Sequence, residues 1–225
     1  MGVAYSGALV RSGEDRATLV RRTYGLVFAG VIVTAIGVAF GQTQPGLMQA
    51  VVDHPWITLI AMFAPLWMAM RARGRPIQGL GLSFVFTFVA GIMIAPMLYV
   101  AERTTPGITL QAGVLTMTAF GVLSLYAAVS KRDFKAWGTF FIVGLVVLVV
   151  TSLLNIFIQS TAASLWISAA TVLVFSGLLV FDTWRILRSG QYGPDDYVPA
   201  ALNIYLDLLN MFLAIVNLLG GGRRR

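Results

Sequence analysis

Long apolar runs, separated by short polar and basic stretches, make up almost the whole chain. Most of these runs reach the ~20 residues that an α-helix needs to cross the hydrocarbon core of a bilayer. The pattern therefore predicts an all-α integral membrane protein, built as a bundle of seven transmembrane helices. We place the seven helices at Thr23–Gln42, Trp56–Met70, Ile77–Ala101, Ile108–Ser130, Phe134–Phe157, Ala162–Arg188 and Val198–Leu219.

The second run is short and contains Pro65. It can be a tilted helix, a broken helix, or a helix that starts earlier, at Val51. Pro96 lies inside the third run, where a proline removes one backbone hydrogen bond and bends the helix.

Composition limits the chain to a single membrane domain. Hydrophobic residues make up 58% of the 225 positions and charged residues only 11%, against about 25% charged in ordinary soluble domains. We divide the chain into an N-terminal tail (1–22), a transmembrane domain (23–219) and a short basic C-terminal tail (220–225). Cysteine is absent, which excludes disulfides, thiolate metal sites and a cysteine nucleophile.

The net charge of +7 does not indicate nucleic-acid binding, because the basic residues lie between the apolar runs. Twelve of the 16 fall in segments that seven crossings place on one side, whereas the loops on the other side hold only Arg103. Basic loops stay cytoplasmic, so we expect a cytoplasmic N-terminus. The twelve are Arg11, Arg16, Arg21, Arg22, Arg71, Arg73, Arg75, Lys131, Arg132, Lys135, Arg185 and Arg188.

The last three residues, Arg223, Arg224 and Arg225, do not follow this rule. Seven crossings put them outside, so either the basic tail is exported or the last segment is re-entrant and returns. We favour seven crossings because the last apolar run is long enough to cross.

Asp182 and Asp207 are the only acidic residues within the apolar runs. A charged carboxylate at the centre of a membrane helix costs at least ~2.5–3.5 kcal/mol, so such residues normally face the bundle interior and have a function. At 1.5 Å per residue, Asp182 lies about 9 Å from the end of its helix at Arg188, and Asp207 about 13 Å from the start of its helix at Val198. The two helices are antiparallel neighbours, so the carboxylates can meet in the cytoplasmic half.

The last run supports this placement with a polar stripe. Asn203, Asp207, Asn210 and Asn217 are spaced by four, three and seven residues, which is one face of a helix. A weaker stripe on the preceding helix comprises Ser168, Thr171, Phe175 and Asp182.

Two alternatives give the aspartates purely structural roles. Asp182 can pair with Arg185 as an anchor near the interface, and Asp207 can be a neutral, hydrogen-bonded carboxyl that holds helices together. If instead the two carboxylates meet, they cannot both ionise cheaply and they titrate as a unit. A proton, a cation or an arginine can satisfy such a pair, which suits a pH-sensitive gate or a cation site.

Several segments together resemble the Bax inhibitor-1 family, the transmembrane Bax inhibitor motif proteins, in its bacterial branch. The resemblance extends from about Val20 to Leu219. The segments that carry it are SFVFTFVAGIMIAPML (Ser83–Leu98), SKRDF (Ser130–Phe134), VFDTWR (Val180–Arg185) and NIYLDLLNMF (Asn203–Phe212).

The resemblance implies a central last helix wrapped by the other six, and a pH-sensitive calcium leak across the bacterial inner (cell) membrane. It implies that the family's di-aspartyl pair is Asp182 and Asp207, which sense pH and contact calcium transiently. It also implies a latch arginine at the cytoplasmic end of the second helix. Arg71 or Arg73 fits that role, although their register relative to Trp67 is shifted.

These inferences name protons, calcium as the permeant ion, and the lipid bilayer as partners, with no cofactor and no nucleic acid. The main rival is a non-conducting membrane protein that regulates a membrane protease or a stress response. We do not expect an enzyme. Intramembrane aspartyl proteases place their aspartate after Gly-x-Gly, whereas Asp207 follows Tyr205 and Leu206.

Overall fold

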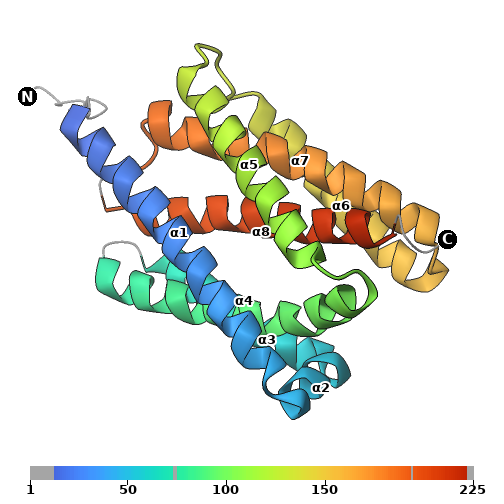
Figure 1. Cartoon of the computed structure of the whole chain (residues 1–225). Helices are drawn as coiled ribbons and strands as arrows, with labels where there is room; N and C mark the ends of the chain where they lie inside the picture. The colour runs from blue at the N-terminus through green and yellow to red at the C-terminus, as the bar shows by residue number, and fades with distance from the viewer. Residues whose placement is uncertain (1–12, 73–74, 194, 222–225) are drawn as a thin grey trace, which may run out of the picture.

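The computed structural model describes residues 13–72, 75–193 and 195–221, and within these ranges it contains eight helices and no strand. Figure 1 shows them as one bundle. They are α1 (Gly13–Gln42), α2 (Pro45–Asp53), α3 (Pro55–Arg71), α4 (Pro76–Thr104), α5 (Ile108–Val129), α6 (Trp137–Ile158), α7 (Thr161–Arg188) and α8 (Tyr197–Gly221).

The expected seven-span membrane fold is confirmed. Six of the described helices are individually long and apolar enough to cross a bilayer, and α2 and α3 make a seventh span when the bent pair is counted as one. This second span is broken, because the chain bends by 98° between α2 and α3. Pro55 begins α3, and its missing N–H and the restriction it places on His54 prevent α2 from continuing.

Helix α1 starts ten residues before the first apolar run, inside the segment that we assigned to the N-terminal tail. An apolar run shows only which residues favour lipid. The ten residues before this run are helical but not apolar, so hydropathy could not show that they belong to the helix. Leu19 in this added part is fully buried, so tertiary packing holds it in the helix. Residues 1–12 of the predicted tail lie outside the described ranges.

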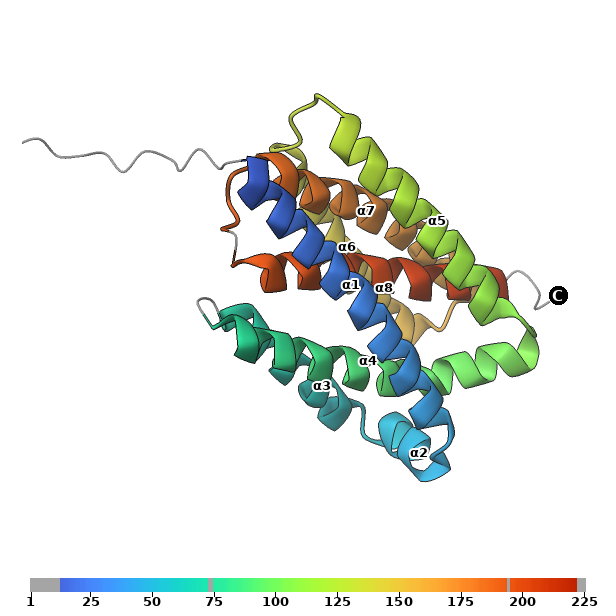
Figure 2. The same ribbon diagram turned by 60° about the vertical axis from the view of Figure 1, so that its left-hand side comes forward.

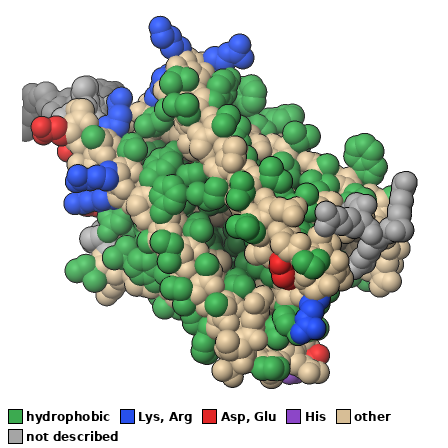
Figure 3. Space-filling view, in the orientation of Figure 1, with side chains coloured by type: hydrophobic (Ala, Val, Ile, Leu, Met, Phe, Trp, Pro, Cys, Tyr) green, Lys and Arg blue, Asp and Glu red, His purple; other side chains and the backbone are tan. Residues whose placement is uncertain are grey.

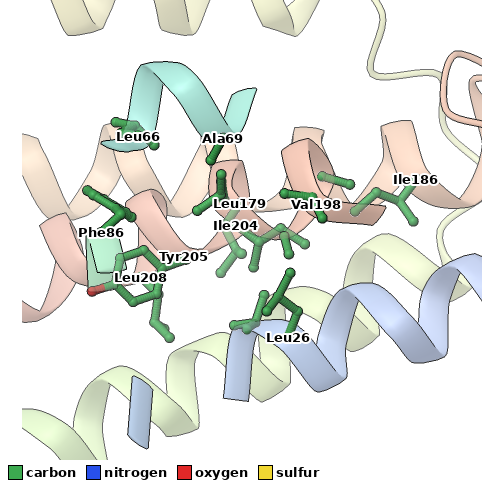
Figure 4. Close-up of a cluster of buried hydrophobic side chains, with 14 of the residues drawn as sticks. Leu26, Leu66, Ala69, Phe86, Leu179, Ile186, Val198, Ile204, Tyr205 and Leu208 are labelled. Carbon is green, nitrogen blue, oxygen red and sulfur yellow. The ribbon is translucent and has the colours of Figure 1, made fainter. Parts of the chain in front are cut away.

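Helix α8 is the central element. Thirteen of its 25 residues are buried, and it packs against α1, α3, α4, α5 and α7. Figures 1 and 2 show it crossing the middle of the bundle. Figure 4 shows its Ile204, Tyr205 and Leu208 among side chains from four neighbouring helices. Among the described helices α6 contacts only α7, so the shell around α8 is less complete than the resemblance implies.

Two glycines allow α1 and α4 to cross in close contact. A Cβ built on Gly91 would lie 2.2 Å from the carbonyl oxygen of Thr34, and one on Gly37 would lie 2.3 Å from that of Phe88. The Thr34 hydroxyl is also 3.0 Å from the Thr87 carbonyl oxygen and 2.6 Å from the Tyr205 hydroxyl. The crossing therefore joins α1 and α4 directly to the central helix.

The helix ends with most of the basic residues gather at one end of the bundle, which we call the basic end. It holds the start of α1 and the α3–α4, α5–α6 and α7–α8 connections, at the left and top of Figure 1. Arg188 of α7 donates to the Ala128 carbonyl of α5 over 3.0 Å, and Arg22 of α1 lies 3.7 Å from Asp195 in the α7–α8 connection. The other connections and the end of α8 lie at the opposite end. The described part of α8 is unbroken, as expected for a full crossing.

Candidate aspartate pair between α7 and α8

Asp182 and Asp207 come from the two helices that the α7–α8 connection joins. Both are buried, with 7% and 4% of their surface exposed. The two helices are antiparallel, and the contact of the Ser176 hydroxyl with the Met211 sulfur, at 3.9 Å, shows which of their residues are level. In that register the two carboxyl groups are close enough to interact electrostatically. The structure therefore brings together the two residues that the sequence singled out.

Asp182 is held by an ion pair within its own helix. Its Oδ1 accepts a hydrogen bond from Nη1 of Arg185 over 2.9 Å. The Arg185 guanidinium also donates to the Gln191 side chain over 3.2 Å and lies 5.2 Å from the ring centroid of Tyr192. This is the Arg185 pairing that we considered as an alternative, and it balances the charge of Asp182 at the basic end.

The carboxyl group of Asp207 has fewer partners than that of Asp182. Its Oδ2 is buried and has no hydrogen-bond partner, and it is the only carboxylate oxygen in this state among the described residues. A buried acceptor without a partner loses its hydration without compensation. A proton shared with Asp182, a water molecule or a cation would each supply what the atom lacks.

The asparagines of α8 occupy three different environments. The Asn203 amide donates to the Tyr192 hydroxyl over 3.1 Å, which ties the polar stripe to the connection that contacts Arg185. The Asn210 amide donates to the Leu206 carbonyl of its own helix over 2.8 Å. Asn217 is exposed and lines a cavity at the opposite end of the bundle. The stripe thus extends from the basic end to the opposite end.

Arg71, one of the two predicted latch arginines, does not contact the pair. Arg71 is exposed, and its guanidinium lies 3.9 Å from the ring centroid of Trp67 on the same helix. Arg73 lies outside the described residues. The latch therefore stays a prediction for both arginines, and the observed partner of Asp182 is Arg185.

The pair does not resemble a resident calcium site. No group of three or more His, Asp or Glu side chains that could hold a metal ion gathers within the described ranges. Calcium takes 6–8 oxygen ligands in proteins, whereas two carboxylates, one of them paired with arginine, supply too few. The arrangement suits a passing cation or a proton better than a bound metal.

Comparison with known proteins identifies the family of the chain. The family model described as "Inhibitor of apoptosis-promoting Bax1" matches residues 16–224. The chain belongs to the Bax inhibitor family.

Three relatives show how widely this family is spread. A Vibrio cholerae protein named "Uncharacterized membrane protein" is 34% identical over 96% of this chain and 94% of its own length. The Golgi anti-apoptotic protein of Vaccinia virus (strain Lister) is 28% identical over 91% of this chain and 85% of its own. Bax inhibitor 1 of Schizosaccharomyces pombe is 29% identical over 91% of this chain and 77% of its own.

Sequence reasoning missed one part of the site in this Bax inhibitor family chain. Tyr192 is buried although it lies in a short polar connection, and it contacts both Arg185 and Asn203. An aromatic residue between Gly190 and Gly193 was the available signal. Gly190 adopts a φ of +69°, a conformation that glycine reaches easily, and the turn there brings Tyr192 back against α8.

Proposed function

We propose that this protein is a pH-sensitive cation leak channel, with calcium as the main permeant ion, gated by Asp182 and Asp207. The observation that carries the proposal is the buried Asp207 Oδ2, which has no hydrogen-bond partner, in a carboxyl group within electrostatic reach of Asp182. A carboxyl pair in a membrane interior is costly unless it exchanges protons or cations. Its position on the central helix lets a change of charge affect the whole bundle.

The Arg185 ion pair determines whether the channel opens or closes as the pH falls. Asp182 attracts Arg185 only while its carboxylate is charged, and Arg185 in turn packs against Tyr192 at the basic end. Proton uptake by Asp182 removes the attraction and loosens these contacts. We therefore expect the closed arrangement to weaken, and cation flux to rise, as the pH falls. A change of about 1.4 kcal/mol in this balance alters the open-to-closed ratio about tenfold.

We further propose that the basic end faces the cytoplasm of a bacterial cell, so that the N-terminus is cytoplasmic. Ten of the basic residues that the structure describes lie in the segments of this end. The contacts between Arg188 and Ala128 and between Arg22 and Asp195 support the grouping of these segments.

Calcium flux into liposomes tests the channel. The purified protein is reconstituted with a calcium-sensitive dye inside, and flux is scanned over about pH 5 to 8, with protein-free liposomes and the double variant Asp182→Asn, Asp207→Asn as controls. We expect flux above the protein-free level that rises as the pH falls, and a flat profile for the double variant. A folded protein that gives only the protein-free flux at every pH would contradict the proposal.

A non-conducting regulator is the second candidate, and the names of two relatives favour it. "Golgi anti-apoptotic protein" and "Bax inhibitor 1" describe effects on cell death rather than transport. In this bacterial-type chain the corresponding role would be regulation of a membrane protease or of a stress response. The same flux measurement separates the candidates, because a regulator of this kind leaves liposomes as tight as protein-free ones.

A further inference from the structure

A cavity of about 550 Å³ lies at the opposite end of the bundle, between α2, α4, α7 and α8, and apolar side chains line most of it. Four polar side chains also line it, Thr104, Thr161, Ser164 and Asn217, and we call it the polar cavity because of them. Asn217 is the last polar residue of the α8 stripe and is exposed, whereas most of that helix is buried. The stripe that holds Asp207 therefore ends in this cavity.

The α8 stripe is more continuous than its asparagines alone suggest. Positions 203, 207, 210, 214, 217 and 221 fall within an arc of about 80° at 100° per residue. Each holds a polar or a small residue: Asn203, Asp207, Asn210, Ala214, Asn217 and Gly221. No bulky apolar side chain projects from this face, which extends over about 21 Å from Asn203 to Asn217.

The facing stripe of α7 is polar only at its cavity end. Ser164 lines the cavity, and Ser168 and Thr171 follow on the same face. The next position holds Phe175, which is buried in the same core cluster as Met211. Because Ser176 is level with Met211, the Phe175 ring lies at the level between Asn217 and Asp207. Phe175 is therefore a buried apolar side chain on the α7 stripe, at a level between the polar cavity and the aspartate pair.

Two helix ends lie at the cavity. Helix α4 ends there, at Thr104, and helix C-termini carry a partial negative charge. Helix α7 begins there, but its N-cap Ser160 accepts a hydrogen bond from the Ala163 amide over 3.2 Å, which satisfies one of its free N–H groups.

A second large cavity, of about 400 Å³, differs in character. It lies between α1, α4, α5 and α8, and apolar side chains such as Val31, Ile94 and Phe212 line most of it. Figure 3 shows the hollow, bordered by hydrophobic side chains. Lipid suits this surface, and the polar cavity offers more polar surface to water and ions than it does.

We infer that the polar cavity is the outer vestibule of the cation path, where hydrated cations collect at Asn217, and that Phe175 is the barrier between them and the aspartate pair. This inference rests on the proposed leak function.

The cysteine-free chain allows a direct test in the full-length protein in liposomes. Asn217→Cys is compared with Leu154→Cys. Leu154 is exposed on α6 and, like Asn217, lies four residues before the end of its helix. Cationic and anionic membrane-impermeant thiol reagents of matched size are applied from outside, and the rates of labelling are measured. We expect Asn217→Cys to react several-fold faster with the cationic reagent, Leu154→Cys not to react, and calcium flux through labelled Asn217→Cys to fall several-fold.

A second pair of variants tests the barrier. We expect Asn210→Cys to be unreactive in the closed channel and to become reactive when Phe175→Ala is added. Several results would overturn the inference: an unreactive Asn217→Cys, equal rates for the two reagents, an unchanged flux after labelling, or an Asn210→Cys that reacts equally with and without Phe175. If the unmodified protein conducts nothing, the proposed leak fails, while the labelling rates still report whether the cavity is a hydrated cation site.

Discussion

Asp207 is buried to 96% in the middle of a helix that crosses the bilayer, and its Oδ2 has no hydrogen-bond partner. An amide is cheaper than a carboxylate in this environment, so Asp207→Asn and Asp182→Asn should insert and fold normally. Each change removes one titrating partner of the pair. We expect each single variant to flatten the pH dependence of calcium flux, and the double variant to add little, because the two groups act as a unit.

Liposome flux at a series of pH values, with protein amounts matched, measures these effects. Asp133→Asn is the matched control, because Asp133 lies in the exposed α5–α6 connection. Two normally folded single variants that both retain the unmodified pH profile would rule out the pair as the sensor.

Arg185 and Arg71 offer a comparison between the observed and the predicted partner of Asp182. Arg185→Gln removes the 2.9 Å ion pair and leaves a buried carboxylate without its counter-charge. We expect a higher basal leak and a weaker response to pH. Arg71 instead stacks on Trp67, so Arg71→Ala should change flux less than Arg185→Gln does. A larger effect of Arg71→Ala would show that the latch forms in another state of the channel.

The sequence identified the two aspartates because a carboxylate in an apolar run is costly wherever the helix lies. The same argument could not choose between Arg71 and Arg185, because that choice depends on side-chain directions. Tyr192 was missed because its burial depends on the turn at Gly190, and hydropathy treats the connection as polar.

At the scale of elements, the α1–α4 crossing depends on the absence of a side chain at Gly91. A Cβ there would lie 2.2 Å from the backbone oxygen of Thr34, so the helices must separate to admit it. We expect Gly91→Ala to destabilise the protein by about 1–3 kcal/mol, as other overpacking substitutions do. Gly113→Ala is the control, because a Cβ at Gly113 meets nothing within 4 Å.

Thermal unfolding in detergent measures both glycine variants. The expected result is a lower midpoint for Gly91→Ala and an equal or slightly higher midpoint for Gly113→Ala, since alanine favours a helix more than glycine does. Equal midpoints for the two variants would mean that the crossing tolerates separation.

Apolar runs predicted the positions of the membrane helices, because lipid contact requires apolar residues in each of them. They did not predict where the second span breaks. Pro45 and Pro55 each begin a helix, so the short α2 formed where we expected an external loop. Hydropathy carries no information on the direction in which a helix runs. The 98° bend between α2 and α3 depends on the backbone conformations that proline allows.

At the scale of the whole molecule, the basic end predicts the topology. Single cysteines in the α5–α6 connection, for example Lys131→Cys, should be protected from an impermeant thiol reagent in intact cells. Thr105→Ser serves as a background control without a thiol, and Pro106→Cys, in the exposed α4–α5 connection, should react. External labelling of Lys131→Cys in intact cells would reverse the proposed orientation.

Helix α3 has only 17 residues and spans ~26 Å, less than the ~30 Å hydrocarbon core of a typical bilayer. The membrane must thin beside α3, or α3 must shift, at a modest cost for each ångström of mismatch. Leu66 and Ala69 of α3 lie against the central helix (Figure 4), so bilayer thickness is coupled mechanically to the element that holds Asp207. Vesicles of long-chain phosphatidylcholine should therefore give a larger leak than short-chain vesicles at the same pH. Equal leaks would show that α3 adapts without disturbing α8.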